Sequence, residues 1–124
     1  MKGEEKHHPE DLKKRTRRFA LEIIKLSAAL PKNTEAQALG KQLLRSGTSV
    51  GAHYRESVRG RSNAEVVSKL EVGLPELEKT RYWVELLAGS GIVQSERLCF
   101  LDEEADELTA ILVTCVKKVK GRSK

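Results

Sequence analysis

Residues 95–119 read SERLCFLDEEADELTAILVTCVKKV and carry the most regular apolar pattern of the chain. Acidic residues occupy the start of this stretch and lysines its end, which complements the dipole of a helix. The pattern predicts an amphipathic helix over about residues 96–119, with Ser95 as its cap. Apolar or small residues keep a heptad rhythm along it, at Leu98, Leu101, Ala105, Leu108, Leu112, Cys115 and Val119.

Three further helices are expected before this one, and no segment alternates like a β-strand. The first begins at Pro9, whose fixed φ suits an opening helical turn. Its buried stripe has steps of three and four residues and consists of Leu12, Thr16, Phe19, Ile23, Leu26 and Leu30. The three helices are predicted over about residues 9–30, 35–59 and 63–88.

Capping signals mark the starts of the second and third helices. Thr34 with Gln37 and Ser62 with Glu65 have the spacing of capping boxes. Pro75 lies inside the third helix, where it removes one backbone hydrogen bond. We expect a kink in the preceding turn rather than a break in the helix.

Short connections between long helices force neighbouring helices to run antiparallel. The sequence therefore predicts an all-α protein, an antiparallel up-down-up-down four-helix bundle over residues 9–120. Its 124 residues suffice for one domain. A polar N-terminal tail is expected at residues 1–8 and a basic C-terminal tail at residues 121–124.

Charge is distributed unevenly along the chain. Residues 1–69 hold fifteen lysines and arginines against eight acidic residues, whereas residues 70–116 hold three against ten. Five more bases follow in residues 117–124. If these segments fold onto one another, the protein has an acidic face and a basic face, and the basic face attracts polyanions.

Basic residues around the second helix are the candidate contacts to nucleic-acid phosphates. Arg55 and Arg59 form an approximate stripe, whereas Arg45 is not expected to share one face with both. No motif that reads bases accompanies them, so we expect contacts with the phosphate backbone. The candidates are Lys41, Arg45, Arg55, Arg59, Arg61 and Lys69, and a second basic group crowds the first helix at Lys13, Lys14, Arg15, Arg17 and Arg18.

Catalytic and metal-binding patterns are missing from the sequence. The pairs Glu4–His7 and Glu5–His8 have the spacing of di-iron ligands, but they precede the first helix. His53 has no serine or cysteine nucleophile placed beside it by sequence. No glycine-rich segment leads into a Lys-Ser or Lys-Thr pair as in a P-loop. We expect no enzymatic activity, no metal and no cofactor.

The expected location is the cytoplasm. Cys99 and Cys115 lie sixteen residues apart, without a Cys-x-x-Cys pair, and are interpreted as ordinary buried or half-buried apolar residues. The charged amino terminus lacks the apolar segment of an export signal. No apolar run approaches the length of a membrane span, so no membrane partner is expected.

Second apolar or small-residue faces on the middle helices indicate self-association. Gly47 and Gly51 lower helix propensity, so a further interaction must offset that cost. Tyr82 and Trp83 are interpreted as one ring in the core and one at an interface, in preference to base stacking. These four residues are the candidate oligomer interface.

Residues 39–56, LGKQLLRSGTSVGAHYRE, resemble the signature of a bacterial four-helix-bundle family, the S23-type proteins first named for intervening sequences of 23S ribosomal RNA genes. The resemblance extends from about Phe19 to Val116. A second matching block comprises Ser68, Lys69, Leu70, Glu76, Glu78, Thr80, Tyr82, Trp83, Glu85, Leu86 and Leu87. The polar residues of the first block are Gln42, Arg45, Ser46, Ser49, Tyr54 and Glu56.

This resemblance implies a non-catalytic bundle that assembles as a ring-like homopentamer. Such a bundle is similar to the accessory protein of diversity-generating retroelements, which binds nucleic acid and a reverse transcriptase. The resemblance also gives a reason for Gly47 and Gly51, because close approach of another helix at a subunit interface would offset their cost. The polar residues of the motif would be internal hydrogen-bonding groups, subunit contacts or ligand contacts. The chain departs from the family at His53, where asparagine is usual, at Lys79, where an acidic residue is common, and at Pro75.

Two functions remain open from the sequence. The first is a homo-oligomer that binds RNA or DNA through basic surfaces, as an accessory to an rRNA intervening sequence or a retroelement. The alternative is a structural or protein-interaction scaffold without nucleic-acid binding. In that case the acidic stretch at residues 96–107 would dock onto a basic segment of a neighbour.

Overall fold

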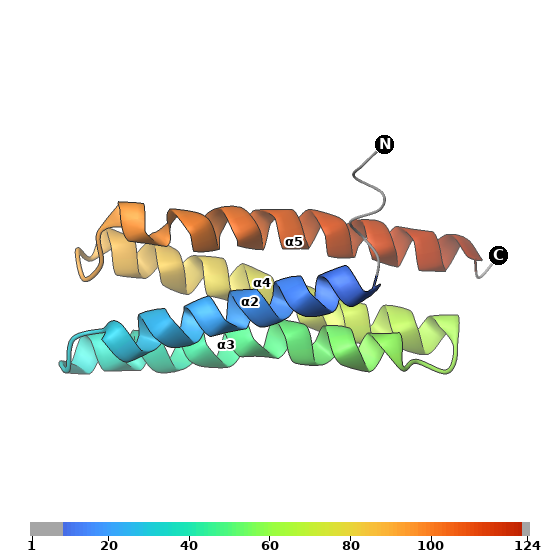
Figure 1. Ribbon diagram of the computed structural model, residues 1–124, viewed down its shortest axis with the longest axis horizontal. Helices are drawn as coiled ribbons and strands as arrows, with labels where there is room; N and C mark the ends of the chain where they lie inside the picture. Colours follow the sequence, from blue (N-terminus) through green and yellow to red (C-terminus); the bar gives the residue numbers. More distant parts are fainter. Residues whose placement is uncertain (1–8, 123–124) are drawn as a thin grey trace.

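The computed structural model describes residues 9–122 of the chain. Consecutive helices lie against one another and run antiparallel, up-down-up-down (Figure 1). The described residues contain no β-strand, and the predicted all-α four-helix bundle is confirmed. The helices are α2 (Pro9–Ala29), α3 (Thr34–Val58), α4 (Asn63–Gly89) and α5 (Ser95–Arg122).

Side-chain caps fix the starts of the two middle helices. Ser62 caps α4 as predicted, because its Oγ accepts a hydrogen bond from the backbone N–H of Glu65 at 3.1 Å. The prediction for α3 is wrong by one residue. Asn33 Oδ1 accepts from the backbone N–H of Ala36 at 2.8 Å, and Thr34 is the first helical residue. Asparagine supplies the same acceptor for the free N–H groups of the first turn.

The last helix is longer than its apolar pattern indicates. α5 begins at Ser95 itself and continues to Arg122, so that two residues of the expected basic tail are helical. α4 continues through Pro75 without a break. The expected N-terminal tail at residues 1–8, with its Glu-x-x-His pairs, lies outside the described residues.

The core follows the predicted stripes. All six residues of the stripe predicted for the first helix, from Leu12 to Leu30, are buried, although Leu30 follows the last residue of α2. In α5 the prediction fails at the third heptad, where Val116 is buried and Cys115 is only half-buried. A straight α-helix drifts by about 20° per heptad, and this drift moves the core position one residue along the chain.

Two glycines allow α2 to pack closely on α3. A Cβ atom at Gly47 would lie 2.7 Å from Cγ1 of Ile23, and one at Gly51 would lie 3.1 Å from Oγ1 of Thr16. Both glycines are buried within the chain. The close approach predicted at these glycines therefore exists, but the helix that approaches is α2 of the same chain rather than a helix of another subunit.

Candidate nucleic-acid interface

Four of the candidate basic residues lie together on the solvent side of α3. Lys41 and Arg59, the C-cap residue of α3, are eighteen residues apart, which is five helical turns, so helix geometry places them on the same side. Arg45 and Arg55 deviate from the direction of these two residues by about 40° to either side. All four side chains are exposed. The expectation that only Arg55 and Arg59 share a face is therefore too narrow. We call these four residues the basic strip, which extends about 27 Å along α3.

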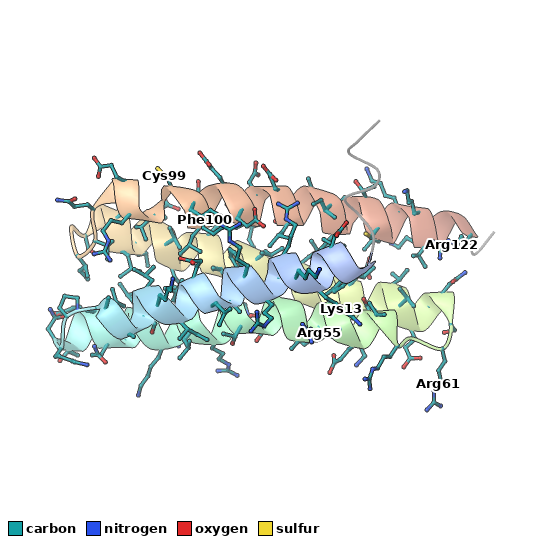
Figure 2. All side chains as sticks on the ribbon, in the orientation of Figure 1. Lys13, Arg55, Arg61, Cys99, Phe100 and Arg122 are labelled. Atoms are coloured by element: carbon teal, nitrogen blue, oxygen red, sulfur yellow. The ribbon has the colours of Figure 1, made fainter. Side chains whose placement is uncertain are left out.

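Basic residues of α2 widen this surface. Thr16 packs against Gly51, and the two helices run antiparallel. Lys13 lies one turn before Thr16 and Arg55 one turn after Gly51, so their side chains are at the same level of the bundle, as Figure 2 shows. Lys14 and Arg17 of α2 are also exposed. The first two helices thus carry the basic face expected from the charge distribution.

The two remaining candidates lie apart from the basic strip. Arg61 follows α3, and its side chain points away from the end of the bundle (Figure 2). Lys69 is on α4, where its Nζ lies 3.6 Å from a carboxylate oxygen of Glu56. The same oxygen lies 3.3 Å from Nδ1 of His53. The His53 hydrogen bond and the Lys69 charge lower the pKa of Glu56. Lys69 is therefore engaged within the chain.

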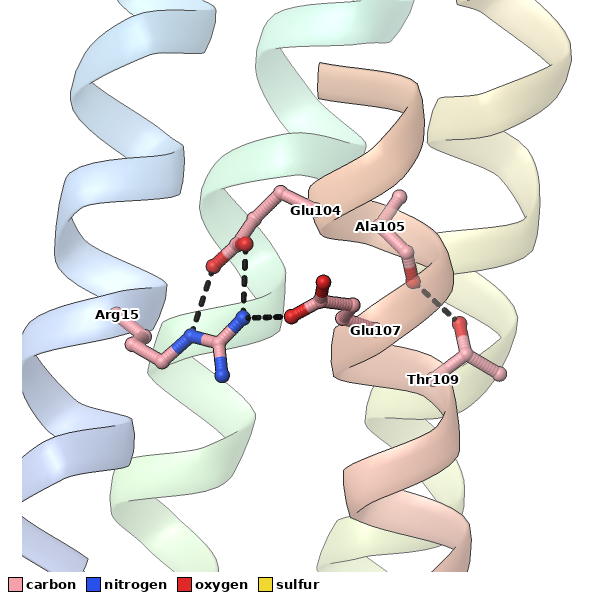
Figure 3. Close-up of polar contacts among 5 residues, drawn as sticks. All are labelled: Arg15, Glu104, Ala105, Glu107 and Thr109. Atoms are coloured by element: carbon pink, nitrogen blue, oxygen red, sulfur yellow. Dashed lines mark hydrogen bonds and ion pairs between the residues drawn. The ribbon is translucent and has the colours of Figure 1, made fainter. Parts of the chain in front are cut away.

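Acidic residues of α5 already have basic partners in the same chain. Arg15 of α2 hydrogen-bonds with Glu104 and Glu107 at 2.8–2.9 Å (Figure 3). Arg81 of α4 hydrogen-bonds with two aspartates of α5. These ion pairs occupy part of the acidic stretch that the scaffold alternative assigns to a neighbouring molecule.

The polar residues of the family-like motif have different environments. Ser46 and Tyr54 are buried, whereas Gln42 and Glu56 are exposed. Ser46 Oγ lies 2.8 Å from Oγ1 of Thr80 on α4. Ser49 donates a hydrogen bond to the backbone oxygen of Arg45 at 2.7 Å. Ser46 is thus an internal hydrogen-bonding group, one of the roles that the resemblance implies, whereas the hydrogen bond of Ser49 is exposed and stays within α3.

The adjacent aromatic residues differ in exposure. Tyr82 is 52% exposed, whereas Trp83 is half-buried and packs against the core. Their ring centroids are 5.2 Å apart. This arrangement leaves Tyr82 available as a surface contact, while Trp83 faces the α3–α4 contact together with Gln42, Arg45 and Glu76, residues that lie around the same small cavity.

Residues 9–122 hold no group of three or more His, Cys, Asp or Glu side chains able to bind a metal ion. None of the helices in this part of the chain combines the length and apolar character needed to cross a membrane.

Residues 10–114 match the sequence model of the 23S rRNA-intervening sequence proteins. The chain belongs to this family. The resemblance noted in the sequence is thereby confirmed. No curated protein matches the chain.

A solved relative has the same fold as this 23S rRNA-intervening sequence protein. It is a protein of unknown function from the S23 ribosomal protein family of Bacteroides thetaiotaomicron, with a crystal structure at 1.70 Å. The two chains are 31% identical, and their structures superpose with a TM-score of 0.82. The similarity covers 88% of this chain and 97% of the relative.

The cavity between α3 and α4 is the feature of this family member that sequence reasoning missed. Its residues appear in the sequence as separate features: positions of the family motif, a basic candidate and one member of an aromatic pair. The available signal was the presence of polar residues on both helices, among them Gln42 and Ser46 of α3 and Glu76 of α4. These residues form one cavity only when α3 packs against α4, and no local sequence pattern shows which residues of the two helices meet.

Proposed function

We propose that this 23S rRNA-intervening sequence protein is a non-catalytic homo-oligomer that binds RNA or DNA through phosphate contacts. The basic strip carries the proposal. Arg15 and Arg81 are engaged by carboxylates, whereas none of the four strip residues forms an ion pair with another residue of the described chain. Unpaired, exposed cations along one helix are available to phosphate groups.

The strip predicts how binding depends on salt. About four phosphate contacts give a slope of log K against log salt of about −4 on duplex DNA and about −3 on a single strand. No strip residue is held by a rigid network that would aim it at a base edge, so discrimination between sequences is expected to be weak. The family is named after 23S rRNA intervening sequences, so a structured RNA of that origin is the first ligand to test.

Self-association is the second part of the proposal. Gly47 and Gly51 are occupied by α2, which leaves the outer side of α4 as the candidate subunit contact. Tyr82 is 52% exposed there and Val72 is 46% exposed, values that are high for apolar side chains of this size. Light scattering of the purified chain and of Tyr82→Ser tests this part, and a lower mass for the variant is the expected result.

Binding is tested by fluorescence anisotropy with a structured RNA and a duplex DNA at low and high salt. The triple variant Lys41→Glu, Arg55→Glu, Arg59→Glu is expected to abolish binding or to reduce the salt slope by about three. Arg97→Glu is the matched control, because Arg97 is exposed on the acidic helix α5 and forms no ion pair within residues 9–122. This control is expected to bind nearly as well as the wild type.

Absence of binding at low salt would overturn the nucleic-acid proposal, because phosphate contacts are strongest there. The scaffold alternative would then be favoured, with a protein such as a reverse transcriptase as the partner to test. If the triple variant and the control lose equal binding free energy per unit of charge changed, binding does not depend specifically on the strip.

A further inference from the structure

A small polar cavity lies between α3 and α4, next to the basic strip. Its volume is about 170 Å³, close to the size of a small polar group with its hydration. Five of its six lining residues are polar, and the consecutive helices α3 and α4 contribute three residues each. The lining residues are Gln42, Arg45 and Ser46 of α3 and Glu76, Lys79 and Trp83 of α4.

Two buried hydroxyl groups lie beneath this cavity and are satisfied within the chain. Thr80 Oγ1 donates to the backbone oxygen of Glu76 at 2.7 Å. Ser46 Oγ, 2.8 Å from Thr80 Oγ1, is left to donate to it. Ser46 and Thr80 are 3% and 1% exposed. They join the two helices as a fixed floor and keep no hydrogen atom for a ligand.

Three donor groups around the cavity have no acceptor within residues 9–122, although Glu76 contributes a carboxylate to the lining. The guanidinium of Arg45 and the side-chain amide of Gln42 form no hydrogen bond within residues 9–122. Trp83 Nε1 is buried and also lacks a partner in this part of the chain. A buried N–H group without an acceptor costs free energy, and native proteins contain few of them. This cost applies to the buried indole N–H of Trp83, whereas Arg45 and Gln42 are exposed and free to turn toward a ligand.

The charges of the cavity favour an anion. Lys79 Nζ lies 3.6 Å from Oε2 of Glu76, so these two side chains neutralise each other. Arg45 then adds one positive charge without a counter-charge. The Lys79 side chain is largely exposed and lies one helical turn before Trp83 on the same side of α4.

We infer that this cavity binds one small oxyanion group, a phosphate or a carboxylate. Arg45 supplies the forked guanidinium that suits either group, and Gln42 and the Trp83 indole donate the remaining hydrogen bonds. Lys79 moves from Glu76 toward the bound anion. This inference goes beyond the proposed nucleic-acid binding and does not depend on it. The cavity and the basic strip share Arg45, and their other residues differ.

Trp83 makes the inference directly testable, because it is the single tryptophan of the chain. The full chain is titrated with sodium phosphate and, separately, with sodium acetate at constant ionic strength maintained with chloride. Tryptophan fluorescence and the ¹H–¹⁵N NMR signal of the one indole N–H are recorded. A saturable change with at least one anion is expected. The anion that saturates at the lower concentration identifies the group, phosphate or carboxylate, that the site prefers.

Two variants separate a site from general electrostatic attraction. Arg45→Gln is expected to raise the apparent Kd about tenfold, as loss of a charge-assisted hydrogen bond predicts. Arg59→Gln removes the same charge from the same helix outside the cavity and is expected to leave Kd unchanged. Indole signals that do not respond to either anion would overturn the inference, and so would equal weakening by the two variants. The nucleic-acid test uses residues outside the cavity, so the two proposals can fail separately.

Discussion

Arg15 of α2 and Glu104 of α5 form a bidentate ion pair, in which Nε and Nη2 donate to the two carboxylate oxygens at 2.9 and 2.8 Å (Figure 3). Nη2 also donates to Glu107 at 2.8 Å. Hydrogen bonding with Glu104 raises the pKa of Arg15 further above its ordinary value, so its charge is kept throughout the folded range. The guanidinium of Arg18 lies 4.8 Å from the ring centre of Phe100 in the same contact. These interactions close the bundle, because they join its first and last described helices.

Arg15→Gln is expected to lower the free energy of unfolding by about 1–2 kcal/mol, because it leaves the Glu104 carboxylate, 14% exposed, without its charged partner. Chemical denaturation followed by circular dichroism measures the change. Salt screens exposed ion pairs more than buried ones. High salt should therefore reduce the part of the destabilisation that comes from the exposed Arg15–Glu107 pair and leave the part from Glu104.

Arg81→Gln is the matched control for this experiment. Arg81 also bridges two acidic residues of α5, Asp102 and Asp106, but its partners are mostly exposed. Exposed pairs contribute about 0–1 kcal/mol. Equal destabilisation by the two variants would contradict the special role of the Arg15–Glu104 pair in closing the bundle.

Gly47→Ala is expected to destabilise the fold by about 1–3 kcal/mol, although alanine has the higher helix propensity. The added Cβ would lie 2.7 Å from Cγ1 of Ile23, which is fully buried. Thermal and chemical denaturation measure the loss. The oligomeric state of the folded protein should not change, because the contact lies within one chain.

The control for this substitution is Gly89→Ala at the end of α4. A Cβ at Gly89 would meet no atom within 4 Å, so the gain in helix propensity of up to about 1 kcal/mol is expected without a steric cost. A double-mutant cycle with Ile23→Ala should show that the cost at Gly47 depends on Ile23. Additive effects in that cycle would refute the steric argument.

The helices and their buried sides could be predicted because both depend on short-range patterns. Burial recurs with the helical period, so the stripe from Leu12 to Leu30 is readable in the sequence. The Ser62 cap involves residues three apart. The error at Cys115 and Val116 has the same origin, since a pattern read as heptads loses its phase along a straight helix.

Contacts between distant residues could not be predicted in this way. The need for a close neighbour at Gly47 is visible in the sequence, but whether Ile23 or another subunit provides it depends on helix pairing. The same holds for Arg15, one of several bases on α2, which becomes an internal ion-pair partner only because Glu104 lies opposite. The cavity beside Trp83 likewise exists only when α3 and α4 pack together.

The two cysteines are expected to react with thiol reagents at different rates. Cys99 is exposed, so the expectation that it is buried or half-buried is wrong, whereas Cys115 is half-buried as expected. Burial raises the pKa of the Cys115 thiol, so less of the reactive thiolate is present at about pH 8. A disulfide reagent should therefore give a fast and a slow phase. Cys99→Ser should remove the fast phase and Cys115→Ser the slow one, and the opposite assignment would contradict the structure.

Glu56 is expected to contribute to the acid sensitivity of the fold. The hydrogen bond with His53 and the charge of Lys69 lower its pKa in the folded protein. The contacts of the ionised Glu56 carboxylate stabilise the folded state, and this stabilisation is complete above the unfolded-state pKa of about 4.3. It is lost as the pH falls through the lower pKa of the folded state. The fall in Tm between about pH 6 and about pH 3 should therefore be smaller for Glu56→Gln than for the wild type.

Glu103→Gln, an exposed control on α5 without a partner in the described chain, should behave like the wild type. An unchanged pH dependence in Glu56→Gln would show that the contacts with His53 and Lys69 do not stabilise the folded state.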